Sequence, residues 1–190
     1  MRNYLFLLVC TVLATGAWSA RAQVVPSASK VQSSLQVGVM GSWFQPDYAG
    51  GGVPMASPQH LGGFGAYADF GLSRWVRIEG EARFSRWNQY LAIHQDNYLL
   101  GLNVPIHTFG PVTPYGKLLF GMTRMNFEYN LTTCRCATIA YGGGADVRLN
   151  QRWSVRAIDF EYQQLPNWVS GQPDQLHPYG FSAGIAYHVF

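Results

Sequence analysis

The sequence predicts an all-β fold, an eight-stranded antiparallel up-and-down transmembrane β-barrel. Hydrophobicity alternates with a period of two along most of the chain, which is typical of strands. Charged residues make up only 12% of the chain, and beyond the N-terminal leader no segment is apolar enough for a transmembrane helix. A chain that spans a membrane without such a helix must do so as a closed barrel, because lipid leaves no solvent to satisfy a free strand edge.

Residues 1–22 resemble a secretory signal peptide. Arg2 precedes an apolar run over residues 4–14, and residues 20–22, Ala-Arg-Ala, supply a cleavage site before Gln23. A retained anchor is the competing interpretation, but the run is shorter than the roughly 20 apolar residues that a span needs. Removing this segment takes away two arginines and lowers the net charge from +3 to +1, so nothing points to a nucleic-acid partner.

The polar segment 23–33 is expected to be a periplasmic lead-in, and the barrel to occupy residues 34–190. Prolines, glycines and polar residues separate the runs of alternating hydrophobicity. The expected strands are, in order, 34–44, 61–71, 75–87, 96–104, 114–127, 139–149, 153–162 and 178–190. The connections 45–60, 88–95, 128–138 and 164–176 are longer than those between, which is typical of external loops and short periplasmic turns.

The third strand shows the alternation most clearly. In the stretch from Trp75 to Trp87, apolar or small residues at 76, 78, 80, 82 and 84 alternate with four charged residues at 77, 79, 81 and 83. A soluble sandwich could also place such a charged face in water. The flanking tryptophans and the scarcity of charge elsewhere favour a membrane barrel, with the apolar face toward lipid and the charged face inside.

The seventh strand changes parity. Val155 and Ala157 share one face, but Phe160 and Tyr162 join that face only if one residue is extra near residues 157–158. We therefore predict a β-bulge there.

The second and sixth strands begin a weak internal repeat. Each of the two hairpins that begin there contains Ala-Asp, then Leu, Arg-Trp and Val-Arg. Asp146 comes 77 positions after Asp69. Two such hairpins in a closed sheet would lie about half a turn apart.

Cys134 and Cys136 are the two cysteines that follow the leader. An export signal implies an oxidising compartment, so the pair is either a local disulfide in the loop 128–138 or two free thiols. Two thiolates without a neighbouring histidine do not make a zinc site, and we expect neither a metal nor a cofactor.

The chain resembles the OmpA-like outer-membrane β-barrel family in its small single-domain form. The resemblance rests on three segments, PYGKLLFGMTR (114–124), RLNQRWSVRAIDFEY (148–162) and the last strand with its C-terminal aromatic, and covers residues 34–190. It implies an outer-membrane location in a Gram-negative-type bacterium, contact with outer-membrane lipid and lipopolysaccharide, and recognition of the last strand by the assembly machinery. Phe190 departs from the family pattern because it is out of step with Tyr187, Ile185 and Phe181.

Eleven charged residues are expected to face the lumen. An eight-stranded barrel is only wide enough for its own side chains, so these groups should pair there and fill it. A narrow gated conduction path through the same charges is the alternative. The residues are Asp69, Arg77, Glu79, Glu81, Arg83, Lys117, Asp146, Arg148, Arg156, Asp159 and Glu161. Aromatic residues near the strand ends are expected at the membrane interfaces, namely Trp43, Trp75, Trp87, Tyr115, Trp153 and Tyr179.

Other function classes fit less well. An enzyme acting on lipid A would need a nucleophile, a histidine and a carboxylate on the outer rim, and only His94, near Ser85 and Asp96, suggests one. A soluble lipocalin-like carrier would reverse the polarity and bury Ile78 and Phe84. We expect a monomeric, non-enzymatic barrel with a structural or adhesive role through its external loops.

Overall fold

The period-two segments form eight β-strands. The computed structural model describes residues 34–46, 60–87, 93–126, 133–166 and 176–190. The predicted signal peptide and lead-in lie outside the described residues, among which no helix is long and apolar enough to cross a membrane. The strands are β1 (Ser34–Gln45), β2 (Leu61–Gly71), β3 (Arg77–Trp87), β4 (His94–Pro105), β5 (Val112–Asn126), β6 (Thr133–Arg148), β7 (Trp153–Gln164) and β8 (Tyr179–His188).

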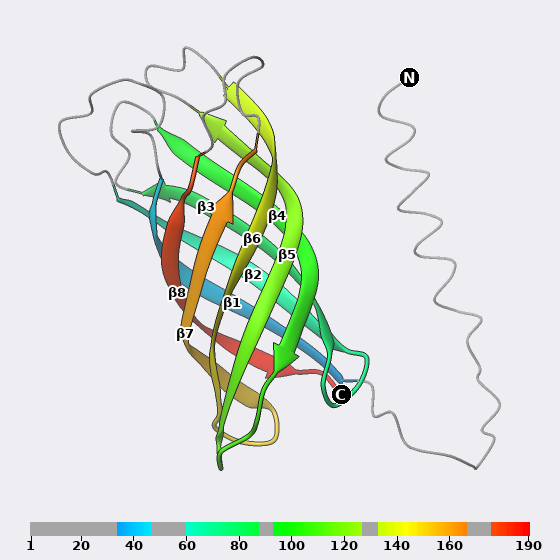
Figure 1. Ribbon diagram of the computed structural model, residues 1–190. Helices are drawn as coiled ribbons and strands as arrows, with labels where there is room; N and C mark the ends of the chain where they lie inside the picture. The colour runs from blue at the N-terminus through cyan, green and yellow to red at the C-terminus, as the bar shows by residue number, and fades with distance from the viewer. Residues whose placement is uncertain (1–33, 47–59, 88–92, 127–132, 167–175) are drawn as a thin grey trace, which may run out of the picture. The chain divides into compact units, whose positions relative to one another are not determined.

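The sheet closes on itself. Each strand pairs antiparallel with the next along the chain, and β8 pairs with β1, where Val39 lies opposite Ile185. Figure 1 shows the resulting up-and-down arrangement. The predicted fold class, a closed antiparallel barrel of eight strands, is confirmed.

The turns 72–76 and 149–152 lie at the end of the barrel where β1 begins and β8 ends, at the bottom of Figure 1. Each is closed by a polar side chain. The Ser73 hydroxyl accepts hydrogen bonds from the backbone amides of Trp75 and Val76, both 3.2 Å long. The Asn150 carboxamide oxygen accepts from Arg152 and Trp153, both 2.8 Å long. These are short turns of the kind expected on the periplasmic side.

The two longest connections, 46–60 and 165–178, lie at the opposite end. The predicted third loop is shorter than expected, because β6 begins at Thr133 rather than at residue 139. Cys134 and Cys136 therefore lie in a strand, and the prediction that they lie in a loop is wrong. A disulfide joins the two cysteines. Strand alternation continues through them, with Arg135 and Ala137 exposed while Cys136 and Thr138 are buried.

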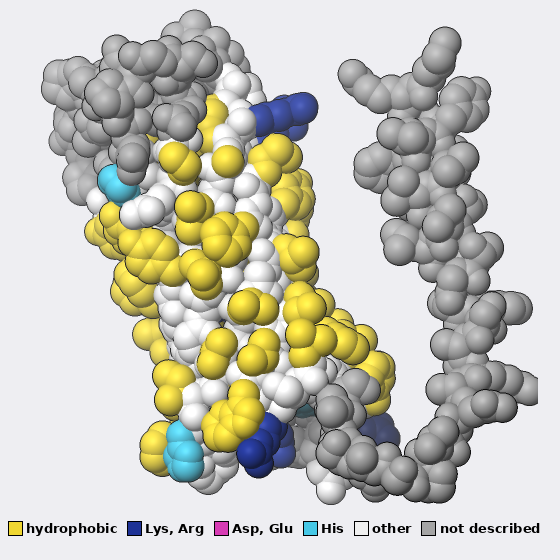
Figure 2. Space-filling view, turned by 45° about the vertical axis from the view of Figure 1, so that its right-hand side comes forward, with side chains coloured by type: hydrophobic (Ala, Val, Ile, Leu, Met, Phe, Trp, Pro, Cys, Tyr) yellow, Lys and Arg dark blue, Asp and Glu magenta, His cyan; other side chains and the backbone are white. Residues whose placement is uncertain are grey.

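The two faces of the sheet have opposite polarity. Most outward side chains are apolar and exposed, for example Val39 at 60% and Leu100 at 61%, whereas the inward Glu79 and Arg83 are both fully buried. Figure 2 shows hydrophobic side chains over the middle of the visible face. This arrangement is typical of membrane barrels, which have lipid outside and a polar interior.

The predicted bulge in β7 is confirmed. The pairing with β8 shifts between Arg156 and Asp159, so that Ala157 and Ile158 are both exposed. The extra residue keeps both Arg156 and Asp159 inside the barrel, which a regular strand could not do because they are three positions apart.

Candidate functional site

The interior of the barrel brings together most of the charged residues that the sequence placed there. Arg77 is partly buried and Arg148 is exposed at the turn end of the barrel. The other nine are buried, namely Asp69, Glu79, Glu81, Arg83, Lys117, Asp146, Arg156, Asp159 and Glu161.

Lys117 occupies the centre of this interior. Its ammonium nitrogen lies 2.7 Å from Asp159, 2.8 Å from Glu161, 3.1 Å from Glu81 and 3.7 Å from Glu79. These carboxylates come from β3 and β7, two strands that do not pair with each other. One cation therefore links opposite walls of the barrel.

Arg156 makes the second cross-lumen cluster, nearer the turn end. Its guanidinium contacts Asp69 at 3.0 Å, Glu79 at 3.2 Å and Asp146 at 3.3 Å. It also lies over the ring of Tyr67, with 3.7 Å from Cζ to the ring centroid. The planar guanidinium of arginine can donate to several acceptors at its edge while its face lies against an aromatic ring.

The internal repeat is visible in this cluster. Asp69 and Asp146 occupy matching positions of the two copies, and so do Arg77 and Arg156. Across the lumen Arg156 pairs with Asp69 while Arg77 pairs with Asp146 at 3.2 Å, so each arginine binds the aspartate of the other copy. The two hairpins, β2–β3 and β6–β7, lie four strands apart in the closed order, the half turn expected from the repeat.

Above Lys117 the interior changes from charged to neutral. Arg83 pairs with Glu81 at 2.5 Å and with Glu161 at 3.2 Å, and lies 4.8 Å from the ring centroid of Phe44. Beyond it comes a layer of amides and hydroxyls, in which the Gln95 amide donates to both Asn97 and Gln163. Thr123 and Thr138 extend these hydrogen bonds, while the buried atoms Gln95 Oε1 and Asn97 Nδ2 have no hydrogen-bond partner among the described residues.

A hydrophobic layer closes the end that carries the long connections. It consists of Met125, Cys136, Leu165 and Leu176, all 4% exposed or less, with Cys134 packed against them. This layer was not expected from the sequence. The parity of the fifth strand, which turns Lys117 inward, also turns Met125 inward and could have revealed it.

The buried carboxylates do not form an open metal site. Oxygens of Glu81, Asp159 and Glu161 lie within 4.8 Å of one another, a spacing that could suit a cation. The Lys117 ammonium contacts all three. Among the described residues the cation of this cluster is thus a side chain of the protein itself.

A small cavity of about 30 Å³ opens at the turn end of the lumen. Its lining includes Arg77, Asp146, Arg148 and His188. A volume of this size holds about one water molecule. The Arg77–Asp146 ion pair forms part of the wall of this cavity.

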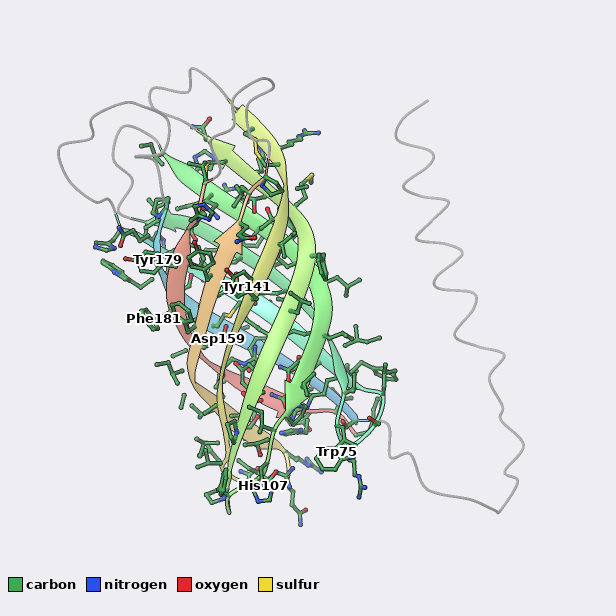
Figure 3. All side chains as sticks on the ribbon, viewed as in Figure 1. Trp75, His107, Tyr141, Asp159, Tyr179 and Phe181 are labelled. Atoms are coloured by element: carbon green, nitrogen blue, oxygen red, sulfur yellow. A yellow bond between two sulfur atoms is a disulfide. The ribbon has the colours of Figure 1, made fainter. Side chains whose placement is uncertain are left out.

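Five of the six predicted interface aromatics lie on the outer surface, from Tyr179 at 39% exposed to Trp87 at 60%. Figure 3 shows Trp75 near the turn end and Tyr179 toward the other end. Tyr115 is a correction, because it is 3% exposed and its hydroxyl donates a 2.9 Å hydrogen bond to Asp159 inside the barrel. Tyr115 lies two residues from Lys117 and must share its face.

The residues considered for catalysis do not converge. Ser85 is buried on the inner face, whereas Asp96 belongs to the outward parity and is held by Arg86 through hydrogen bonds of 2.9 and 2.5 Å. Neighbouring positions on paired strands that face opposite sides of a sheet cannot act on one bond. Ser85, His94 and Asp96 therefore do not share one face of the sheet.

Comparisons with known proteins agree with this architecture. The family model "Outer membrane protein beta-barrel domain" matches residues 10–188. Among solved structures, Neisserial surface protein A (NspA) is similar with a TM-score of 0.55 and 11% identity, over 80% of this chain and 96% of that one. OprG from Pseudomonas aeruginosa gives a TM-score of 0.55 and 13% identity, over 82% of this chain and 95% of that one.

No curated protein sequence matches the chain. The two structural likenesses show a shared fold, and the family model covers nearly the whole sequence. The structure agrees with this family model, because eight antiparallel strands close into a barrel with an apolar outer face and a buried charged interior. The chain belongs to the outer membrane protein β-barrel domain family.

Proposed function

We propose that the protein is a non-enzymatic structural barrel of the outer membrane whose lumen does not conduct ions. The observation that carries this proposal is the series of side-chain layers that the described residues form inside the lumen. Charged clusters around Arg156 and Lys117 are followed by the amide layer and then by the hydrophobic layer of Met125, Leu165 and Leu176. A permeating ion would have to break buried ion pairs and then cross an apolar constriction, and both steps are energetically unfavourable.

The external connections 46–60 and 165–178 give the protein its proposed adhesive surface. They are the longest segments between strands and leave the barrel at the end opposite the short turns. Loops held on a rigid scaffold are common sites of recognition. Their sequences are rich in glycine and proline, include the aromatic residues Tyr48 and Trp168, and name no particular partner.

The remaining proposals concern assembly. Residues 1–22 are a signal peptide cleaved before Gln23, the barrel is a monomer in contact with lipopolysaccharide, and the assembly machinery recognises its last strand. N-terminal sequencing of protein from the outer-membrane fraction tests the first of these. A first residue of Gln23 agrees with the proposal, and retention of Met1 contradicts it.

A gated channel is the second candidate, and one observation favours it. Charged and amide groups line much of the described interior from the mouth cavity up to Gln95, with buried apolar side chains such as Met40, Leu99 and Leu119 among them. Recording from the full chain in a planar bilayer separates the two functions. A structural barrel gives no current steps above the bare membrane, while a bilayer with a general porin serves as the positive control. Repeated unitary steps from the wild-type chain would replace the structural role with conduction.

The adhesive role has its own test. Residues 48–58 are replaced by a Gly-Ser segment of equal length, and cells that display either chain are tested for attachment to host cells and to one another. Heat-modifiable migration on gels checks that the altered barrel still folds. Weaker attachment by the altered chain supports the adhesive role, and equal attachment removes segment 46–60 from it.

A further inference from the structure

The outer face of the barrel carries an arginine pair near the end with the long connections. Arg124 on β5 and Arg135 on β6 are directly opposite each other in the strand pairing, and both are exposed. They share the outward face with the apolar residues Met122 and Ala137, which are the next outward pair. On the face that Figure 2 shows, basic side chains lie only toward the two ends of the barrel, beyond the hydrophobic middle.

Neither arginine has an acidic partner among the described residues. The nearest carboxylate in the pairing is Asp96, which lies opposite Arg124 on β4. Both oxygens of Asp96 are bound by Arg86, at 2.9 and 2.5 Å, and the residue is only 2% exposed. Together, Arg86, Asp96, Arg124 and Arg135 therefore carry three positive charges and one negative charge.

Like charges directly opposite each other destabilise a strand pair. At the edge of a membrane this repulsion is stronger than in bulk water, because the lower dielectric screens it less. A bound anion between the two guanidinium groups would remove the repulsion. Phosphate fits the position, since each planar fork can donate two parallel hydrogen bonds to its oxygens.

The pair lies near the ends of its two strands, where lipid headgroups are expected. Arg124 lies two residues before the end of β5, and Arg135 lies two residues after the start of β6. Trp43, an exposed interface aromatic, lies two residues before the end of β1. Aromatic girdles mark the boundary between hydrocarbon and headgroups, so the arginines are placed at the same boundary.

We propose that Arg124 and Arg135 form a binding site for a phosphate group of an outer-leaflet lipid, with the acyl chains of that lipid against Met122 and Ala137. This proposal rests on the proposed function in one respect, the orientation of the barrel, in which the end with the long connections faces the outside of the cell. A ligand with an anionic head directly above an apolar body matches the order of residues down β5 and β6. A soluble phosphate would use the charges alone and gain nothing from the neighbouring apolar surface.

The test uses the full chain folded in micelles of an uncharged detergent. Lipid A with its phosphates, lipid A from which the phosphates have been removed, and sodium phosphate are added separately, and retained molecules are counted by native mass spectrometry. The test variant is R124Q/R135Q. The matched control is R74Q/R152Q, which removes two exposed arginines from the turns at the opposite end. Heat-modifiable migration confirms that each variant is folded.

The wild-type chain and the control are expected to retain phosphorylated lipid A, and R124Q/R135Q to bind it at least about tenfold more weakly. Lipid A without phosphates should bind all three chains alike. Equal affinity of the test variant and the wild type overturns the proposal, and so does an equal loss in the control. Complete displacement of the lipid by excess sodium phosphate would instead assign the pair to free phosphate. Conductance by the wild-type chain would refute the proposed function but leave this result intact.

Discussion

Lys117 and Glu161 form an ion pair inside the barrel, with 2.8 Å between the ammonium nitrogen and a carboxylate oxygen and with side chains that are 0% and 1% exposed. They belong to β5 and β7, which are separated by β6 in the sheet. The pair therefore joins strands that backbone hydrogen bonds do not join. Charges buried this deeply are stable only as a balanced cluster, because removal of one leaves an uncompensated charge away from water.

Replacing Lys117 with methionine should lower the free energy of unfolding by about 3–5 kcal/mol. The substitution removes the cation that contacts Asp159 and leaves Glu81 and Glu161 with Arg83 alone. Urea unfolding of the protein in lipid vesicles measures the loss. The double variant K117M/E161Q should recover part of it, with a coupling of about 1 kcal/mol or more, because it also removes one of the unpaired charges. A loss below 1 kcal/mol in the single variant would show that the cluster does not stabilise the barrel.

Arg156 and Arg77 should differ in their contributions although they occupy matching positions of the repeat. Arg156 is fully buried and contacts three carboxylates, whereas the Arg77 side chain is 20% exposed and contacts only Asp146 among the described residues. We expect R156Q to lower the free energy of unfolding by about 3–5 kcal/mol, and R77Q by about 1 kcal/mol or less. The same urea titration compares the two variants. Equal losses would mean that burial does not decide the strength of these pairs.

Tyr115 should be sensitive to loss of its hydroxyl group. The Y115F variant leaves one oxygen of the buried Asp159 without its tyrosine donor, which should lower the free energy of unfolding by about 1–3 kcal/mol. Tyr98 is the control, because it is 45% exposed on the outer face and Y98F should change the stability by less than about 0.5 kcal/mol. If both variants unfold at the same urea concentration, the hydrogen bond to Asp159 has no energetic role.

Met125 and Met122 test the hydrophobic layer with one residue type on one strand. Met125 is fully buried in the lumen, while Met122 is 43% exposed on the outer face. M125A should leave a cavity and lower the free energy of unfolding by about 2–5 kcal/mol. M122A should have a much smaller effect, because lipid can fill the space. Comparable losses at the two positions would contradict a packed layer inside the barrel.

The sequence was sufficient to predict which side chains of a strand face the lumen, because this depends only on the alternation along that strand. The alternation over residues 76–85 is sufficient to place Arg77, Glu79, Glu81 and Arg83 on one face, and the apolar composition of the other face indicates which side meets lipid. The bulge near Ala157 could be predicted for the same reason, since a change of parity leaves few alternatives in a continuous strand.

Contacts across the lumen could not be predicted in this way. Arg156 binds Asp69 and Glu79, which precede it by 87 and 77 positions, and these pairings depend on how strands on opposite walls are staggered. The repeat placed the two hairpins half a turn apart but did not show that each arginine would bind the other copy's aspartate. Tyr115 was misplaced because its residue type, typical of a girdle, was given more weight than its parity with Lys117. The start of β6 lies earlier than predicted because the polar residues Thr133 and Arg135 are more typical of a loop than of a strand.

The central claim is that apolar side chains face lipid while charged side chains fill a closed interior. A spin label at residue 39 tests it most directly, because Val39 is near the middle of β1, 60% exposed and outward. The variant V39C, with Cys134 and Cys136 changed to serine, is labelled and folded into lipid vesicles. The account predicts frequent collisions of the label with oxygen, which is concentrated in the bilayer, and few with a water-soluble nickel complex. The reverse pattern would place residue 39 in water and contradict the membrane barrel.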